Sequence, residues 1–72
     1  MRARYIIRHH PGLMTEIIVE TEGQGEKQIE DRFSLFDSTD YVRRSCEGRG
    51  LAPFVFERPD HNTYIAPWIT LT

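Results

Sequence analysis

A Pro11-Gly12 pair between two runs of β-branched residues is the feature that most restricts the fold. Proline presets φ for the second position of a turn and glycine tolerates positive φ at the third, which together specify a type II turn. Residues 3–9 before the pair and 14–21 after it are rich in strand-favouring Ile, Val and Tyr. We therefore expect an antiparallel hairpin. Alternate positions of its second strand share one solvated face: Glu16, Ile18, Glu20 and Glu22.

A Gly23-Gln24-Gly25 break follows, and residues 26–36 then have the composition of a helix. Their acids concentrate in the first turns, where the helix dipole favours negative charge. Leu35 lies off the apolar stripe of this helix, so it is either partly exposed or a sign that the helix ends earlier. The stripe itself has spacing i, i+4, i+7: Ile29, Phe33 and Phe36.

A second, shorter helix is expected directly afterwards. Residues 38–40, Ser-Thr-Asp, offer an N-cap, and residues 41–47 continue to Gly48, which serves as a C-cap.

The apolar period returns to two from Ala52 onward, which predicts a third strand with Phe54 and Phe56 on one face. A turn cluster at 59–62 separates it from a fourth strand at 63–71, expected to pair back on the third.

Pro67 falls inside the fourth strand and cannot donate a ladder hydrogen bond, so it should lie at an edge or a bulge. The expected order is ββα(α)ββ. This is an α+β fold, a small antiparallel sheet of about four strands with one main helix and a short second helix packed on one face. The 72 residues make a single small domain, 1–72, too small for a large enclosed active site.

Cys46 is the only cysteine, so no internal disulfide can form, and a reducing cytoplasmic setting fits this composition. No secretory signal pattern precedes the first strand, and apolar runs are far shorter than the ~20 residues that span a bilayer. We expect no membrane association.

Charge is distributed unevenly although the net charge is only −2. Residues 1–10 are basic, residues 11–40 are strongly acidic, and residues 41–60 are rich in arginine. On a helix over 26–36 and its continuation, Glu26, Glu30 and Asp37 would lie within about 40° of one another and form an acid ridge. Such a ridge is either a solvated face or a surface that meets basic residues of a protein partner.

His9 and His10 are candidate metal ligands, with Asp60, His61 or Cys46 as further donors. Adjacent strand residues point to opposite faces, however, and no zinc spacing pattern is present. We expect no metal and no cofactor.

Catalysis would need Cys46 to act as a nucleophile with a distant histidine, its pKa lowered by nearby arginines. A lone cysteine on a short helix is more often a small buried apolar residue. The chain has no oxyanion-hole motif, nucleophile elbow or phosphate loop, so no catalytic residue and no enzyme is predicted.

Arginines in the later segment support an alternative, a small nucleic-acid-associated regulator, because guanidiniums suit phosphates and aromatic residues stack on bases. An acidic protein is repelled by a polyanion, which weakens this alternative. Its candidate residues are Arg43, Arg44 and Arg49.

The opening Met-Arg-Ala-Arg-Tyr-Ile-Ile-Arg, followed by a Glu-rich strand, an acidic helix and two later strands, resembles some small phage-encoded anti-CRISPR proteins. The resemblance implies a non-enzymatic inhibitor, in the bacterial host cytosol, that binds a CRISPR effector subunit and blocks access of target DNA or recruitment of a nuclease. Members of that group often present acids to a basic nucleic-acid channel. Their sequences vary widely, so no functional residue is carried over by position.

We therefore predict an interaction protein that docks an acidic helix face on a basic partner surface. Exposed strand edges or Leu35 also leave a homodimer open. The candidate partner-binding residues are Glu26, Glu30, Asp31, Asp37 and Asp40.

Overall fold

The computed structural model describes residues 1–32, 34–51 and 53–71 and confirms the predicted hairpin. β1 (Arg2–His9) pairs antiparallel with β2 (Thr15–Thr21) along its whole length. Leu13 donates its N–H to the His10 carbonyl across 2.8 Å, and Gly12 has a φ of 80°. These are the features of the expected type II turn.

Residues of the predicted main helix form a third strand instead. β3 (Gly25–Arg32) pairs antiparallel with β2, so the expectation of a helix over 26–36 is wrong. The connecting turn has a φ of 80° at Gly23 and 83° at Gly25, a conformation that glycine adopts without steric cost. β3 is an edge strand and is largely exposed to solvent.

The apolar stripe expected on that helix is not formed. Ile29 stands at a β-bulge opposite Ile17 and Ile18 and is 43% exposed, while Phe36 is 77% exposed. Phe33, the middle member of the stripe, lies outside the described residues.

α1 (Leu35–Gly48) is the one helix of the described residues and spans the segment expected to form the short helix. The expected pair of helices is therefore not found. The N-cap of α1 is Ser34 and not one of residues 38–40. The Ser34 hydroxyl accepts a hydrogen bond from the Asp37 N–H at 3.3 Å. The buried residues recur every four positions: Ser38, Val42 and Cys46.

The expected third strand is reduced to one bridge, between Glu57 and Ile65. Ala52, where it was to begin, lies outside the described residues. Phe54 and Phe56 nevertheless share a face, since their ring centroids are 5.1 Å apart.

The expected fourth strand is divided into β4 (Thr63–Ile65) and β5 (Ile69–Thr70), and both pair with β1. Pro67 lies in the break between them, as expected for a residue that cannot donate to a ladder. The sheet order is β3-β2-β1-β4, with β5 also against β1.

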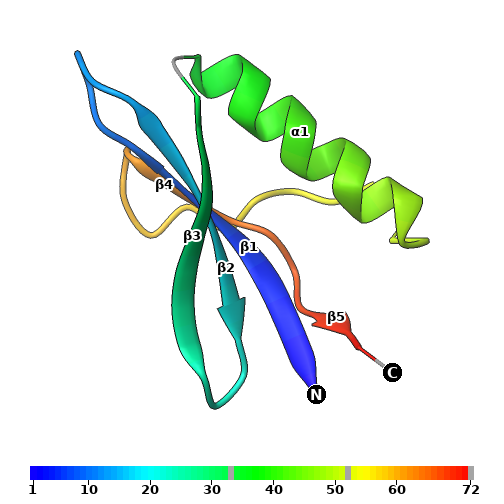
Figure 1. Ribbon diagram of the computed structural model, residues 1–72. Helices are drawn as coiled ribbons and strands as arrows, with labels where there is room; N and C mark the ends of the chain where they lie inside the picture. Colours follow the sequence, from blue (N-terminus) through cyan, green and yellow to red (C-terminus); the bar gives the residue numbers. More distant parts are fainter. Residues whose placement is uncertain (33, 52, 72) are drawn as a thin grey trace.

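Two layers result, and Figure 1 shows α1 lying over one face of the sheet. We call this the inner face. On the opposite, outer face, Ile6 and Ile18 are cross-strand partners and only 3% exposed. The inner face, α1 and the following segment enclose the core: Ile7, Ile17, Val42, Cys46, Phe56 and Ala66. The coarse prediction of an α+β domain with an antiparallel sheet is confirmed.

Candidate functional site

An exposed aromatic ring stands where β3 leads into α1. Phe36 occupies the first turn of the helix, about 160° around the axis from the buried Ser38, so its ring points away from the sheet. It is 77% exposed. Figure 1 shows the end of β3 close to the start of α1, so the last residues of the strand and the first turns of the helix form one corner.

Four of the five acids predicted to bind a partner belong to this corner. We call these four residues together with Phe36 the acidic corner: Glu30, Asp31, Phe36, Asp37 and Asp40.

Asp37 is an acid of the corner whose carboxylate is both exposed to solvent and without an ion pair to any described residue. It lies in the first turn of α1, where the helix dipole stabilises a carboxylate. Asp40 is 3.1 Å from Arg44, whose side chain is largely exposed, while that of Asp40 is about half exposed. An ion pair at the surface contributes little to stability, so Asp40 can exchange Arg44 for a basic group of a partner.

The other two acids of the corner are consecutive residues of β3, so the pleat of the strand points them to opposite faces. Glu30 lies opposite Ile17 on the inner side and pairs with Arg32 at 3.0 Å. Asp31 lies opposite Glu16 on the outer side and accepts a hydrogen bond from Gln28 at 2.6 Å.

Glu26, the fifth predicted acid, does not belong to this corner. It lies near the other end of β3 on the outer face, where Arg8 donates two hydrogen bonds to its carboxylate at 2.8 and 2.9 Å. These bonds lower the pKa of Glu26. The predicted ridge of Glu26, Glu30 and Asp37 is therefore wrong, because it required a helix.

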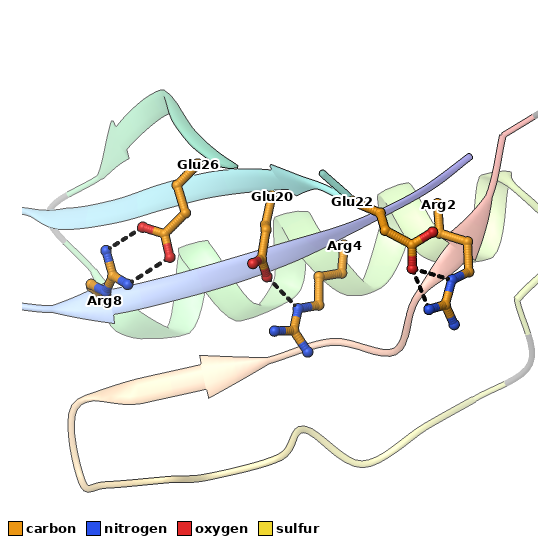
Figure 2. A network of polar contacts seen from close by, with 6 residues as sticks. All are labelled: Arg2, Arg4, Arg8, Glu20, Glu22 and Glu26. Atoms are coloured by element: carbon orange, nitrogen blue, oxygen red, sulfur yellow. Dashed lines mark hydrogen bonds and ion pairs between the residues drawn. The ribbon is translucent and has the colours of Figure 1, made fainter. Parts of the chain in front are cut away.

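An ion-pair ladder on the outer face was missed by sequence reasoning. Figure 2 shows arginines of β1 extending toward glutamates of the second and third strands and the turn between them. The signal was present, since arginines occupy even positions of the first strand and glutamates even positions of the second. The pairs are Arg2 with Glu22, Arg4 with Glu20, and Arg8 with Glu26.

Trp68 completes this outer face. The Arg4 guanidinium lies 4.2 Å from the centre of its ring and that of Arg2 lies 5.1 Å away. Arg2 and Arg4 thus each form both an ion pair with a glutamate and a cation–π contact with Trp68. The charges of the ladder are therefore compensated within the molecule, and the ladder offers little to a charged partner.

The three arginines of the nucleic-acid alternative have different surroundings. Arg43 stacks 4.8 Å from the Phe56 ring and donates to the Phe54 carbonyl at 3.4 Å. Arg44 pairs with Asp40. Arg49 follows α1 and forms no ion pair with any described residue.

His9 and His10 have ordinary structural partners, and Cys46 is a core residue. His9 contacts the Thr15 hydroxyl through Nδ1 at 2.9 Å, and His10 contacts Glu16. Cys46 is buried in the core, and that burial raises the pKa of its thiol. Within 1–32, 34–51 and 53–71, no three His, Cys, Asp or Glu residues gather as a metal site.

Comparisons of the chain with protein-family models, curated proteins and solved structures found no match. In the part of the chain that the structure describes, no helix has the length and apolar character needed to cross a membrane. The acidic corner is therefore assigned from its geometry and chemistry.

Proposed function

We propose that this protein is a non-enzymatic interaction module that docks its acidic corner on a basic surface of a partner protein. The observation that carries this is the exposed Phe36 ring beside the open charge of Asp37. Aromatic side chains surrounded by polar groups dominate the binding energy of many protein interfaces. Complementary charge around such a ring accelerates docking and fixes its register.

The partner class follows from the chemistry of the corner and from the resemblance to anti-CRISPR proteins. A surface that binds nucleic acid is basic, and carboxylates can occupy its phosphate positions. We infer that the partner is a CRISPR effector subunit of a bacterial host, and that the acidic corner covers its nucleic-acid-handling surface. The protein would then act in the host cytosol.

Capture from lysate tests this function. The tagged chain is incubated with bacterial lysate that contains CRISPR effector complexes, treated with nuclease and washed at moderate salt. Bound proteins are identified by mass spectrometry. A stoichiometric effector subunit is the expected result. Recovery of no protein after nuclease treatment would contradict the proposal.

Charge reversal then tests the surface. Glu30→Lys with Asp37→Lys should abolish capture without unfolding the chain, which circular dichroism checks. The matched control reverses two exposed acids outside the corner, Glu47→Lys with Glu57→Lys, and should retain capture. Capture by the first double variant at the level of the control would show that another surface binds.

The nucleic-acid alternative has its own outcome in the same experiment. Nucleic acid recovered when nuclease is omitted, with no protein recovered when it is present, would favour a regulator that uses Arg43, Arg44 and Arg49. Retention on heparin with a steep dependence on salt would support it further.

A further inference from the structure

A groove opens on the inner face at the end of the sheet that α1 leaves uncovered. It holds about 160 Å³ of solvent-accessible space. Figure 1 places this end, with β5 and the N-terminus, opposite the β3–α1 corner. Most of its wall residues are apolar: Ala3, Tyr5, Val19, Ile69 and Leu71. The polar wall residues are Thr21, Arg49 and Arg4, and Arg4 is already paired with Glu20.

The apolar walls arise from the pleat of the sheet. Ala3, Tyr5 and Val19 occupy the same face as Ile7 and Ile17, but they lie nearer the N-terminus of β1. Leu71 remains 37% exposed beside them. An apolar groove of this kind favours an apolar ligand, because covering it removes hydrocarbon surface from water.

The charge beside the groove is positive. Arg49 lines it and forms no ion pair with any described residue. Lys27 lies directly opposite Val19 in the register, so its side chain emerges on the same face. The nearest glutamates of β2 and the following turn, Glu20 and Glu22, are on the outer ladder and already paired.

We propose that this groove binds a small carboxylic acid with an apolar body, its hydrocarbon part against Tyr5 and Val19 and its carboxylate on Arg49. An apolar cavity of about 150 Å³ accommodates a benzene-sized molecule, so the body has roughly six carbons. Guanidinium and carboxylate form two parallel charge-assisted hydrogen bonds, which orient the ligand. This site is separate from the acidic corner, and its occupancy does not depend on the proposed function.

The test uses three probes with the same six-carbon tail: hexanoate, hexanol and hexylammonium. Each is titrated into the full-length ¹⁵N-labelled chain while backbone amide shifts are followed by NMR. Hexanoate should give saturable shifts at Ala3, Tyr5, Val19 and Ile69, with an affinity roughly tenfold higher than that of hexanol. Hexylammonium should not saturate.

Variants assign the carboxylate contact. Arg49→Gln should weaken hexanoate roughly tenfold and leave hexanol unchanged. The control is Arg44→Gln, which changes an exposed arginine of α1 that does not line the groove and should bind hexanoate as the parent does. Val19→Trp should fill the groove and remove binding of both probes.

Four results would overturn the assignment. Shifts confined to another surface, or no saturable shifts with any probe, would show that the groove is not a binding site. Equal affinity for hexanoate and hexanol, or an unchanged hexanoate affinity in Arg49→Gln, would show that Arg49 does not select a carboxylate.

Discussion

Ile17 and Ile18 are neighbours on β2, yet they are buried by different means. Ile17 faces inward and is enclosed with Ile7, Val42 and Cys46 in the core. Ile18 faces outward, where its cross-strand partner is Ile6 and no described helix covers the sheet. Both isoleucines are almost completely removed from water.

On the outer face the Ile6–Ile18 pair is bordered by Ile65 of β4 and by charged side chains. Arg4, Arg8, Glu16 and Glu20 flank the Ile6–Ile18 pair in the register, and long side chains bury their hydrocarbon stems while their charged ends pair in solvent. A chain with a single described helix thereby protects both faces of its sheet. Charged side chains thus take the place of a second helix on the outer face, and we expect this cover to adapt to a cavity more readily than the packed inner core.

The largest expected effect compares these two isoleucines directly. Ile17→Ala should reduce the free energy of unfolding by about 3–4 kcal/mol, because the helix and sheet around it cannot collapse into the cavity. Ile18→Ala should cost about 1–2 kcal/mol, since the covering side chains can move inward. Urea unfolding followed by circular dichroism measures both. Equal losses would mean that the outer face is packed as rigidly as the inner one.

Variants of Trp68 test how much the side chains of the outer face stabilise the protein through an aromatic ring. Trp68→Ala should cost about 2 kcal/mol, because it removes a half-buried ring and its contacts with Arg2 and Arg4. Trp68→Phe keeps an aromatic face and should lose less than half as much. A loss by Trp68→Phe as large as that of Trp68→Ala would rule out ring stacking as the cause.

The inner face is covered by α1, and the N-cap residue Ser34 determines where this helix begins. Ser34→Ala removes the N-cap acceptor and should destabilise the protein by about 1 kcal/mol. Ser34→Asp retains a cap and should behave as the parent chain in the same unfolding experiment. Identical stability of the two variants would place the start of the helix elsewhere.

The smallest expected effect is the acid sensitivity of the outer ladder. Bonding to Arg8 lowers the pKa of Glu26, and bonding to Arg2 lowers that of Glu22. A carboxylate whose pKa is lower in the folded than in the unfolded chain stabilises the fold above its unfolded pKa, and this contribution is lost as pH falls through the folded value.

The urea midpoint of the parent should therefore drop between about pH 5 and pH 3 more than that of Arg8→Gln. The difference at pH 7 should be no more than about 0.5 kcal/mol, because the pair is partly exposed, and it should shrink in high salt. Parallel pH profiles for the two proteins would show that the Arg8–Glu26 pair does not contribute to the stability of the fold.

The hairpin was predictable because its signals are local. Pro11 and Gly12 determine the turn by their own backbone preferences, and the β-branched residues on either side favour strands. The alternation of Phe54 and Phe56 was likewise readable, although the segment forms one bridge rather than a strand.

β3 was not predictable in the same way, because tertiary pairing overrides its composition. Glu26, Lys27, Gln28 and Glu30 all have good helix propensity. At an exposed edge strand neither face must be apolar, so the alternation that identifies a strand is missing. The error displaced the predicted acid ridge. A helix would place Glu26 and Glu30 on one face, whereas the bulge between them in β3 leaves Glu26 on the outer side and Glu30 on the inner side.

Part of the candidate site could still be found from sequence. Glu30, Asp31, Asp37 and Asp40 are close along the chain and stay close to one corner however the segment folds. Phe36 was assigned to an apolar stripe because its spacing from Ile29 fits a helix, and only the actual start of α1 exposes it.

The most direct test of the docking surface compares two exposed apolar residues. Phe36 belongs to the acidic corner, and Val55, 89% exposed, does not. Binding of the captured partner is measured by calorimetry for the parent, Phe36→Ala and Val55→Ala. We expect Phe36→Ala to weaken binding by about 2 kcal/mol, roughly thirtyfold, with Val55→Ala unchanged. Equal affinity for all three proteins would contradict docking through the acidic corner.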